Sequence, residues 1–263
     1  ALQYFTGSKE HNVALRSLAL KQGLSLNEYD FTGDGEMPEV HEEGDIYRAL
    51  GLLFIPPELR ENRGEIEASD QGKLPDLIKK ENLRGTFHNH TTASDGNNSL
   101  LEMAEAAHDL GLEYLGIADH SKASFQANGL NELRLREQIS EIRALNEQFD
   151  DFALIAGSEV DILKDGSLDF DDDLLQELDY CVASVHNSFT LDEDTMTKRI
   201  IRAMENEHVT MLGHVTGRLL LKRDPYAVNI EKIIACASET RTVIELNCSP
   251  YRLDMDWSWW KKA

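Results

Sequence analysis

From about residue 83 onward, short runs of apolar residues alternate with longer segments of mixed polarity. The apolar runs predict buried strands, which we place at 85–88, 114–118, 152–159, 180–185, 209–213 and 242–246. The segments between them carry apolar residues three or four positions apart, which predicts helices at 99–110, 131–149, 172–178, 193–206 and 229–240. Apolar strands separated by helices are typical of a parallel sheet that is covered by helices. Six such steps without a dinucleotide-binding glycine motif favour a barrel over an open sheet.

The first 62 residues follow a different pattern, which predicts a small α+β piece. Apolar positions at helical spacing indicate a helix at 8–20, capped by Ser8 and ended by Gly23. We expect a strand at 24–31, a turn at 31–36 and a second helix at 42–50. The charged stretch at 63–83 predicts a linker with one short helix at about 74–80. The predicted division is therefore 1–62, a linker at 63–83, and a larger domain at 84–263.

Composition narrows the class of protein without identifying it. The 263 residues are 41% hydrophobic, which is enough for a core, and no apolar run reaches the roughly 18 residues of a membrane span. The three cysteines form no paired motif and the start at Ala1 carries no signal peptide, so we expect a cytoplasmic fragment of a longer protein. The net charge of −22 disfavours nucleic acid unless bound cations cancel part of it. Basic residues nevertheless cluster, at Lys198, Arg199 and Arg202 and at Arg218, Lys222 and Arg223.

Histidines and acids follow the predicted strands, where a parallel barrel gathers its functional side chains on one face. They are His88, His90, Asp119, His120, Glu159, His186, His214 and Asn247. His88 and His90 are two residues apart and should point to one side of an extended chain, with Asp95 in a loop that can fold back toward them. Imidazoles and carboxylates together suit Zn²⁺, Mn²⁺ or Fe²⁺, so we expect a metal centre. The other histidines, at positions 11, 41, 108 and 208, are expected to be solvated.

The same strand ends carry the motifs of a known family. The motifs are HNHTTASD at 88–95, ADHS at 118–121, GSEVD at 157–161, VASVH at 182–186, GHVTGR at 213–218 and NCSPYRLD at 247–254. They resemble the polymerase-and-histidinol-phosphatase (PHP) domain, in the form appended to bacterial family X DNA polymerases. The resemblance implies a distorted (β/α)7 TIM-like barrel, of which six strands are readable here, with up to three divalent metal ions.

The resemblance also implies roles for individual residues. His88, His90 and Glu159 would bind one ion, Asp95 and His120 a second, and Glu159, His186 and His214 a third, with Glu159 as a bridge. Asp119 would orient an imidazole from behind. Catalytic roles would fall to Glu159, His120 and Arg218, while Lys122, Arg218 and Arg252 would hold phosphate oxygens.

The N-terminal piece resembles the C-terminal end (palm end and thumb) of a family X DNA polymerase. The motif YFTGS at 4–8, with Asn12 and Arg16, and the later stretches DIY at 45–47 and PPELR at 56–60 carry this likeness. It implies that Tyr4, Gly7, Asn12 and Arg16 lie near a nucleotide. The catalytic aspartates of polymerisation have no counterpart in the sequence, so we expect no polymerisation from these residues.

The sequence departs from the resemblance at its end. The family closes with an Asp-x-His motif after a seventh strand, and no such motif follows Asp254. We therefore expect truncation at both ends relative to the resemblance, with one metal bound tightly by Glu159, His186 and His214 and the others weakly.

These features predict a metal-dependent phosphoesterase that acts on DNA 3′ ends. The implied activity is a 3′-5′ exonuclease, with 3′-phosphatase or abasic-site activity as further options, in bacterial DNA repair at the nucleoid. The implied partners are gapped or single-stranded DNA and upstream polymerase domains, with no membrane. Two alternatives stay open: a small-molecule phosphomonoesterase of the histidinol-phosphatase type, and a non-catalytic scaffold for the polymerase.

Overall fold

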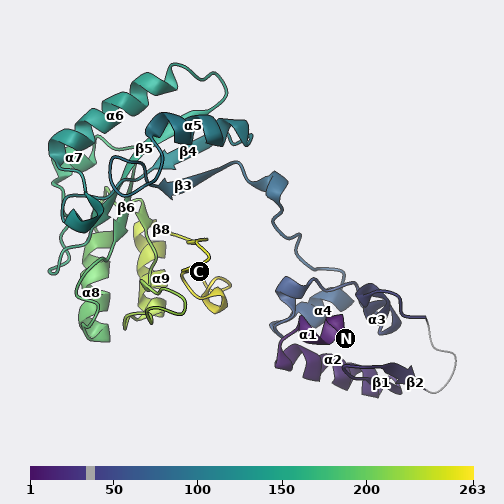
Figure 1. Cartoon of the computed structure of the whole chain (residues 1–263). Coiled ribbons are helices and arrows are strands. Elements are labelled where there is room, and N and C mark those ends of the chain that lie inside the picture. Colours follow the sequence, from purple (N-terminus) through teal and green to yellow (C-terminus); the bar gives the residue numbers. More distant parts are fainter. Residues whose placement is uncertain (34–38) are drawn as a thin grey trace. The chain divides into compact units, whose positions relative to one another are not determined.

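The computed structural model describes residues 1–33 and 39–263, and the chain divides into two compact units (Figure 1). Unit 1 comprises Ala1–Ile78 and unit 2 comprises Lys79–Ala263. Each unit has a hydrophobic core of its own. Within the described ranges, every helix is too short or too polar to cross a bilayer.

Unit 1 is a small helical unit with one two-stranded antiparallel sheet. Its elements are α1 (Leu2–Phe5), α2 (Lys9–Lys21), β1 (Leu24–Leu26), β2 (Phe31–Gly33), α3 (Glu43–Ala49), the 3-10 turn η1 (Pro57–Leu59) and α4 (Glu65–Asp70). Ser8 caps α2 as expected, since its hydroxyl accepts a hydrogen bond from the backbone N–H of His11 at 3.0 Å.

Three predictions for this region were wrong or fall partly outside the structure. The strand expected at 24–31 is two strands, because the side chain of Asn27 accepts hydrogen bonds from the backbone of Tyr29 and Asp30 and turns the chain. The turn expected at 31–36 begins in β2, and its residues 34–36 lie outside the described residues. The short helix expected at 74–80 is found at Glu65–Asp70 instead, followed later by the 3-10 turn η2 (Lys80–Asn82).

His11 is buried, which corrects the expectation that it is solvated. Its Nδ1 lies 2.5 Å from Glu65 and its Nε2 lies 3.1 Å from the hydroxyl of Tyr47. His11 stands four and eight residues before Leu15 and Ala19, which are buried on the same face of α2. The helical spacing therefore indicated that position 11 faces the core, whereas the polarity of histidine suggested a solvated side chain.

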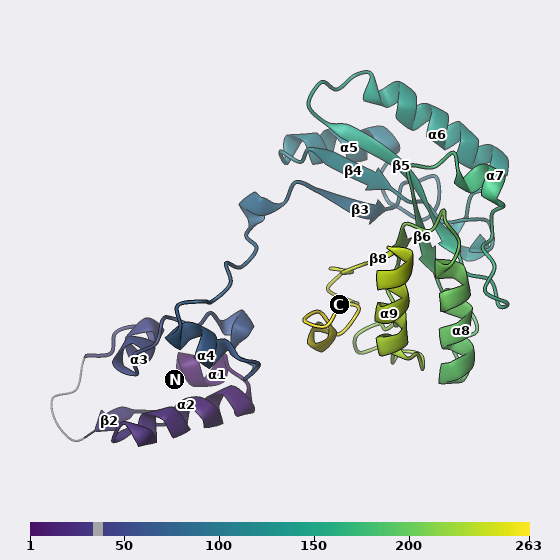
Figure 2. The same ribbon diagram turned by 180° about the vertical axis from the view of Figure 1, so that it is seen from behind.

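Unit 2 confirms the predicted α/β class. Its elements are β3 (Gly85–Asn89), α5 (Leu100–Asp109), β4 (Tyr114–Ile117), η3 (Phe125–Ala127), α6 (Glu132–Asn146), β5 (Ala153–Asp161), α7 (Asp172–Leu175), β6 (Tyr180–Ser184), α8 (Glu193–Met204), β7 (Met211–Leu212), α9 (Ile230–Thr240), β8 (Val243–Ile244) and η4 (Trp257–Trp259). The six strands from β3 to β8 are all parallel and lie in sequence order (Figure 2). All carboxyl ends therefore lie along one edge of the sheet.

Helices cover the outer face of this sheet, as Figures 1 and 2 show. Helices α5 and α6 pack on β4 and β5 through a cluster that includes Leu100, Ile142 and Leu154. Helices α8 and α9 pack beside β6 and β7 through a second cluster that includes Ile200 and Ile233. These apolar faces hold the strands in register beneath the functional site.

The sheet curls so that its two edge strands approach each other. Within the described residues β3 and β8 share no backbone ladder, but His88 of β3 lies 2.5 Å from Glu245, which directly follows β8. The inside of the curl is filled by the ring of Tyr180 with Ala118 and Val182. Gly157 makes this possible, because a Cβ there would lie 2.2 Å from the Tyr180 ring. The result is an open, barrel-like arrangement, as the resemblance implies.

Candidate metal centre

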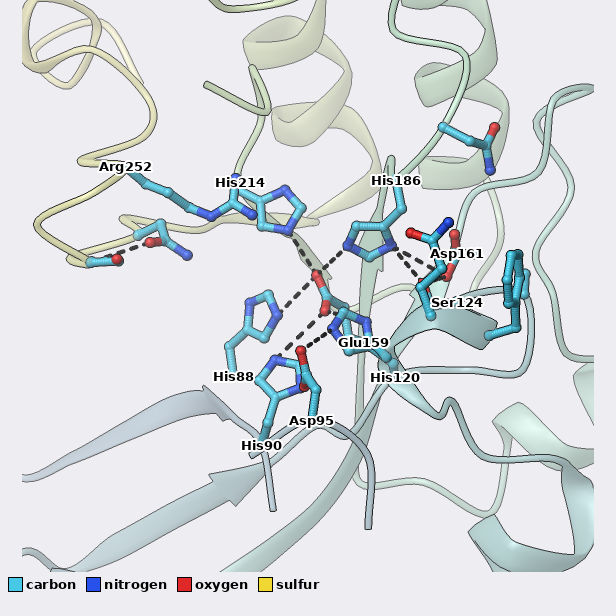
Figure 3. A pocket seen from close by; sticks show the side chains of 17 residues that line it. His88, His90, Asp95, His120, Ser124, Glu159, Asp161, His186, His214 and Arg252 are labelled. Carbon is cyan, nitrogen blue, oxygen red and sulfur yellow. Dashed lines mark hydrogen bonds and ion pairs between the residues drawn. The ribbon is translucent and has the colours of Figure 1, made fainter. Parts of the chain in front are cut away.

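Glu159 lies at the centre of the site, near the carboxyl end of β5, and is only 1% exposed (Figure 3). Five imidazoles surround its carboxylate, each from a different strand or strand end except the pair in and after β3. One oxygen lies 3.0 Å from His88, 3.1 Å from His186 and 2.8 Å from His214. The other lies 2.9 Å from His120 and 3.6 Å from His90. All five histidines expected at strand ends therefore converge on one carboxylate.

Asp95 completes the cluster from the loop after β3. Its carboxylate lies 3.4 Å from His90 and 3.6 Å from His120. Within residues 1–33 and 39–263, three sets of three donors can each surround one ion: His88, Glu159 and His214; His90, Asp95 and His120; and His120, Glu159 and His186. This grouping differs from the one implied by the resemblance, because His214 joins His88 and His90 joins Asp95.

His88 does not follow the regular geometry of its strand. Its φ is +60°, and the register between β3 and β4 shifts between Thr86 and Asn89. Such a bulge re-aims a side chain, and here it places His88 between Glu159 and Glu245. His88 and His90 therefore lie in the same cluster, as expected, but an irregular backbone brings them there and not the regular alternation of a strand.

Two carboxylates that the sequence analysis did not single out support the histidines from outside. Glu245 lies 2.5 Å from Nδ1 of His88 and accepts a hydrogen bond from the backbone N–H of His214 at 2.6 Å. Asp161 lies 3.2 Å from Nδ1 of His186. Such partners fix the orientation of a metal-binding imidazole. Two features of the sequence could have identified these acids: Glu245 follows an apolar strand, and Asp161 stands two residues after Glu159 on the same extended strand.

Asp119 does not orient an imidazole, which corrects the expectation drawn from the resemblance. Its carboxylate accepts hydrogen bonds from the backbone and hydroxyl of Thr91 and Ser94, and from the side-chain amide of Gln138. Asp119 is fully buried. Its role is to hold the loop that carries Asp95.

The charges in the cluster shift the ionisation of its members. Burial opposes protonation of His88, but the carboxylates of Glu159 and Glu245 raise its pKa to about 10. Burial likewise opposes protonation of His186, and Glu159 and Asp161 raise its pKa to about 10. Burial favours the neutral form of Glu159, yet the charges on His88 and His186 hold its pKa well below the usual range. Burial lowers the pKa of His90 and of His214. Protons on His88 and His186 thus offset only part of the negative charge of the cluster, and cations that bound there would displace them.

The residues present fit divalent transition-metal ions. Imidazole nitrogen and carboxylate oxygen are the donors that such ions prefer, and each set offers three donor atoms within 4.8 Å of one another. The Nδ1 atom of His214 is buried without a hydrogen-bond partner among the described residues. Nothing in this donor set favours one of Zn²⁺, Mn²⁺ and Fe²⁺ over the others.

The cluster lines a pocket of about 530 Å³. Its lining includes all seven expected metal ligands and Arg252. Arg218 is absent from the lining of this pocket, because its guanidinium binds the backbone of Arg252 and Leu253 and the carboxylate of Asp256. This placement does not support a phosphate-binding or catalytic role for Arg218.

Lys122 also lies away from the pocket lining. Its ammonium pairs with Glu132 and stands 5.6 Å from the centre of the Phe170 ring. The carboxylate of Asp254 accepts hydrogen bonds from Thr216, and that of Asp256 pairs with Arg218. Arg252 is therefore the cation among the three expected phosphate-binding residues that reaches the pocket.

The four expected nucleotide-binding residues belong to unit 1. The side chain of Asn12 donates to the backbone of Tyr4 at 2.8 Å and accepts from Gln3 at 3.1 Å. Arg16 donates to the backbone of Leu26 at 2.9 Å. Gly7 lies close to the start of α2, where a Cβ would stand 3.2 Å from the His11 ring. The side chain of Asn12 therefore makes these hydrogen bonds within unit 1.

Comparison with known proteins gives two family matches. Residues 86–249 match the family model described as PHP domain, and residues 1–61 match the model described as DNA polymerase beta thumb. The chain is 42% identical over 256 residues to the DNA polymerase/3'-5' exonuclease PolX of Bacillus subtilis (strain 168), which covers 97% of this chain and 45% of that protein.

A second relative matches only the larger unit. It is a probable phosphatase of Thermoanaerobacter sp. (strain X514), 28% identical over 169 residues, which cover 62% of this chain and 64% of that protein. The chain spans less than two thirds of the length of either relative. Among solved structures, histidinol phosphate phosphatase from Lactococcus lactis subsp. lactis Il1403, complexed with zinc, L-histidinol and phosphate, matches at 17% identity with a TM-score of 0.41, over 61% of this chain and 72% of that chain.

Proposed function

The chain belongs to the PHP domain family of metal-dependent hydrolases, and we propose that unit 2 hydrolyses phosphate esters at DNA 3′ ends. The observation that carries this proposal is the arrangement around Glu159. One buried carboxylate is surrounded by five imidazoles, with Asp95 beside them, and all of these side chains line one pocket. Such a dense set of nitrogen and oxygen donors is expected where several cations bind close together.

The side chains divide the work by position. The three donor sets would hold divalent ions, with Glu159 shared between two of the sets. When bound, such ions activate water and stabilise the negative oxygens around phosphorus. Arg252 lines the same pocket and would hold a non-bridging phosphate oxygen. Glu245 and Asp161 would keep His88 and His186 in the orientation that ligation requires.

DNA is favoured as the substrate by unit 1. Residues 1–61 match a polymerase thumb model, and the relative from B. subtilis is named a DNA polymerase and 3'-5' exonuclease. The proposed activity is therefore 3′-5′ exonucleolytic, with 3′-phosphatase and abasic-site activity as extensions of the same chemistry. The similarity to a probable phosphatase keeps a small phosphomonoester as the competing substrate.

The test compares the chain with its Glu159→Gln variant on single-stranded DNA labelled so that 3′ removal is measured. Zn²⁺, Mn²⁺ and Fe²⁺ are supplied separately, and histidinol phosphate is offered as the competing substrate. In the variant, the two donor sets that contain Glu159 should lose their ions, which mass spectrometry of bound metal measures. The rate of DNA hydrolysis should fall at least about 100-fold. Glu105→Gln, an exposed change on α5, is the matched control and should behave like the parent.

Two results would overturn the proposal. Preferential hydrolysis of histidinol phosphate would identify a phosphomonoesterase. No hydrolysis of either substrate with any of the three metals, and no bound metal, would identify a scaffold.

A further inference from the structure

Phe125 stands at the pocket that contains the metal centre. It lines the pocket and is nevertheless 78% exposed. Most of the other side chains that line this pocket are polar or charged, so a largely exposed phenyl ring contrasts with its surroundings. A single exposed apolar residue needs no explanation by itself. Its position beside the donor cluster and the rigidity of the segment that carries it are the features that require one.

The segment that carries Phe125 is tied to the metal centre. The hydroxyl of Ser124 donates to Asp161 at 2.6 Å and lies 3.3 Å from Nδ1 of His186. The backbone of Ala123 donates to the carboxylate of Asp169 at 2.7 Å. The residue before Phe125 thus contacts both a proposed ligand and the acid that orients it.

The other end of the segment is closed just as firmly. The backbone of Gly129 approaches Ser121 so closely that a Cβ on this glycine would lie 1.9 Å from the Ser121 carbonyl oxygen. Arg134 donates to the carbonyl groups of Asn128 and Gly129 at 3.0 and 3.2 Å. A ring held on such a segment loses little conformational freedom when a ligand packs on it.

Arg252 lies across the histidine cluster from Ser124 and Asp161, as Figure 3 shows. The pocket therefore offers a cation on one side, metal ligands at the centre and the segment with the aromatic ring on the other. Its volume of about 530 Å³ is within the range of small-molecule sites. A ligand that matches this order carries negative charge at its centre and a flat apolar group at one end. A nucleotide has this arrangement.

We propose that Phe125 stacks against the base of the 3′-terminal nucleotide and thereby selects ends whose terminal base is unpaired. This inference rests on the proposed function and names its substrate class. Base-on-aromatic stacking tolerates every base, because each has a π face. A paired terminal base leaves only its outer face open and keeps the partner strand beside it, whereas the base of a single-stranded or frayed end can turn freely toward Phe125. The ring would favour nucleotides over phosphate esters that lack a base.

The test measures binding and does not depend on turnover. The full 263-residue chain, loaded with Mn²⁺, is titrated by calorimetry with thymidine 5′-monophosphate and with 2-deoxyribose 5-phosphate, in which a hydroxyl group replaces the base. In Phe125→Ala the dissociation constant for the nucleotide should rise roughly 5- to 150-fold, and that for the sugar phosphate should stay within about twofold. Phe125→Trp should restore nucleotide binding. Leu133→Ala truncates an apolar side chain of α6 that is 65% exposed and lies outside the pocket lining, and it should change neither constant.

The outcomes separate this inference from the function on which it rests. If the parent chain binds both ligands equally, or if Phe125→Ala weakens both to the same extent, stacking is wrong while phosphate binding at the metals stands. If the Mn²⁺-loaded parent binds neither ligand, both the stacking and the phosphoesterase proposals fail.

Discussion

Glu245 holds His88 from the side that faces away from Glu159. Nδ1 of His88 lies 2.5 Å from Glu245, and Nε2 lies 3.0 Å from Glu159, so the two carboxylates fix the plane of the ring. Glu245 also accepts the backbone N–H of His214. One acid therefore positions two proposed ligands without itself belonging to any of the three donor sets.

Glu245→Gln should weaken metal binding although no ligand is removed. An amide cannot carry the charge that favours His88, and its NH₂ group cannot accept the N–H of His214, so we expect affinity to fall about 10- to 100-fold. Calorimetric titration with Zn²⁺ measures this, and circular dichroism should show unchanged secondary structure. Glu239→Gln, an exposed change on α9, is the control. Equal affinity in Glu245→Gln and the parent would exclude the orienting role.

At the scale of elements, the loop after β3 depends on an acid from the next strand. Asp119, which directly follows β4 and Ala118, binds Thr91 and Ser94 and so fixes the loop that ends in Asp95. Gly96 tightens the same loop, because a Cβ there would lie 2.4 Å from the carbonyl oxygen of His90. The position of Asp95 is thus decided by packing between two strand ends.

Asp119→Asn should weaken metal binding at one donor set and not at another. The amide can accept only some of the hydrogen bonds, so the loop should loosen at a cost of about 1–3 kcal/mol in the free energy of unfolding. The set of His90, Asp95 and His120 should lose affinity, while the set of His88, Glu159 and His214 keeps it. A stepwise Mn²⁺ titration with thermal unfolding measures both effects. Asp109→Asn, at the exposed end of α5, is the control. Parallel weakening of every step would contradict this assignment.

At the scale of the whole molecule, the chain consists of two units with separate cores. The core of unit 1 includes Leu15, Tyr47 and Ile55, and the cores of unit 2 lie on both faces of its sheet. All proposed metal ligands belong to unit 2. A ligand that binds one folded unit stabilises that unit by mass action.

Metal should therefore stabilise unit 2 and leave unit 1 unchanged. At a free Zn²⁺ concentration about 100 times the dissociation constant, unit 2 should gain about 2.7 kcal/mol. Hydrogen exchange read by mass spectrometry resolves the two units, and protection should increase only in peptides from 79–263. The Glu159→Gln chain in the same Zn²⁺ should show a smaller gain. An equal increase in both units would mean that they unfold together.

Sequence by itself determined the order and type of the elements in unit 2. The alternation of apolar runs with helical spacing is a local property, since strand and helix periods are set by residues within a few positions. It predicted each of the six strands and the edge at which the polar residues gather, and the family match confirms the resemblance. Boundaries were less certain: β7 and β8 are only two residues long, because curl and tertiary packing decide where pairing ends.

Only the tertiary structure decided which side chains act together. His88 and Glu245 are 157 positions apart, and no local pattern could pair them. For the same reason the sequence placed His11 wrongly, since it is buried against Glu65, and could not show that Arg218 binds the C-terminal segment. The chemical type of a side chain determines which interactions it can make, whereas the curl of the sheet and the course of the loops determine which residues are close enough to interact with it. The strand ends fixed the kind of site, and the fold assigned each donor its neighbours.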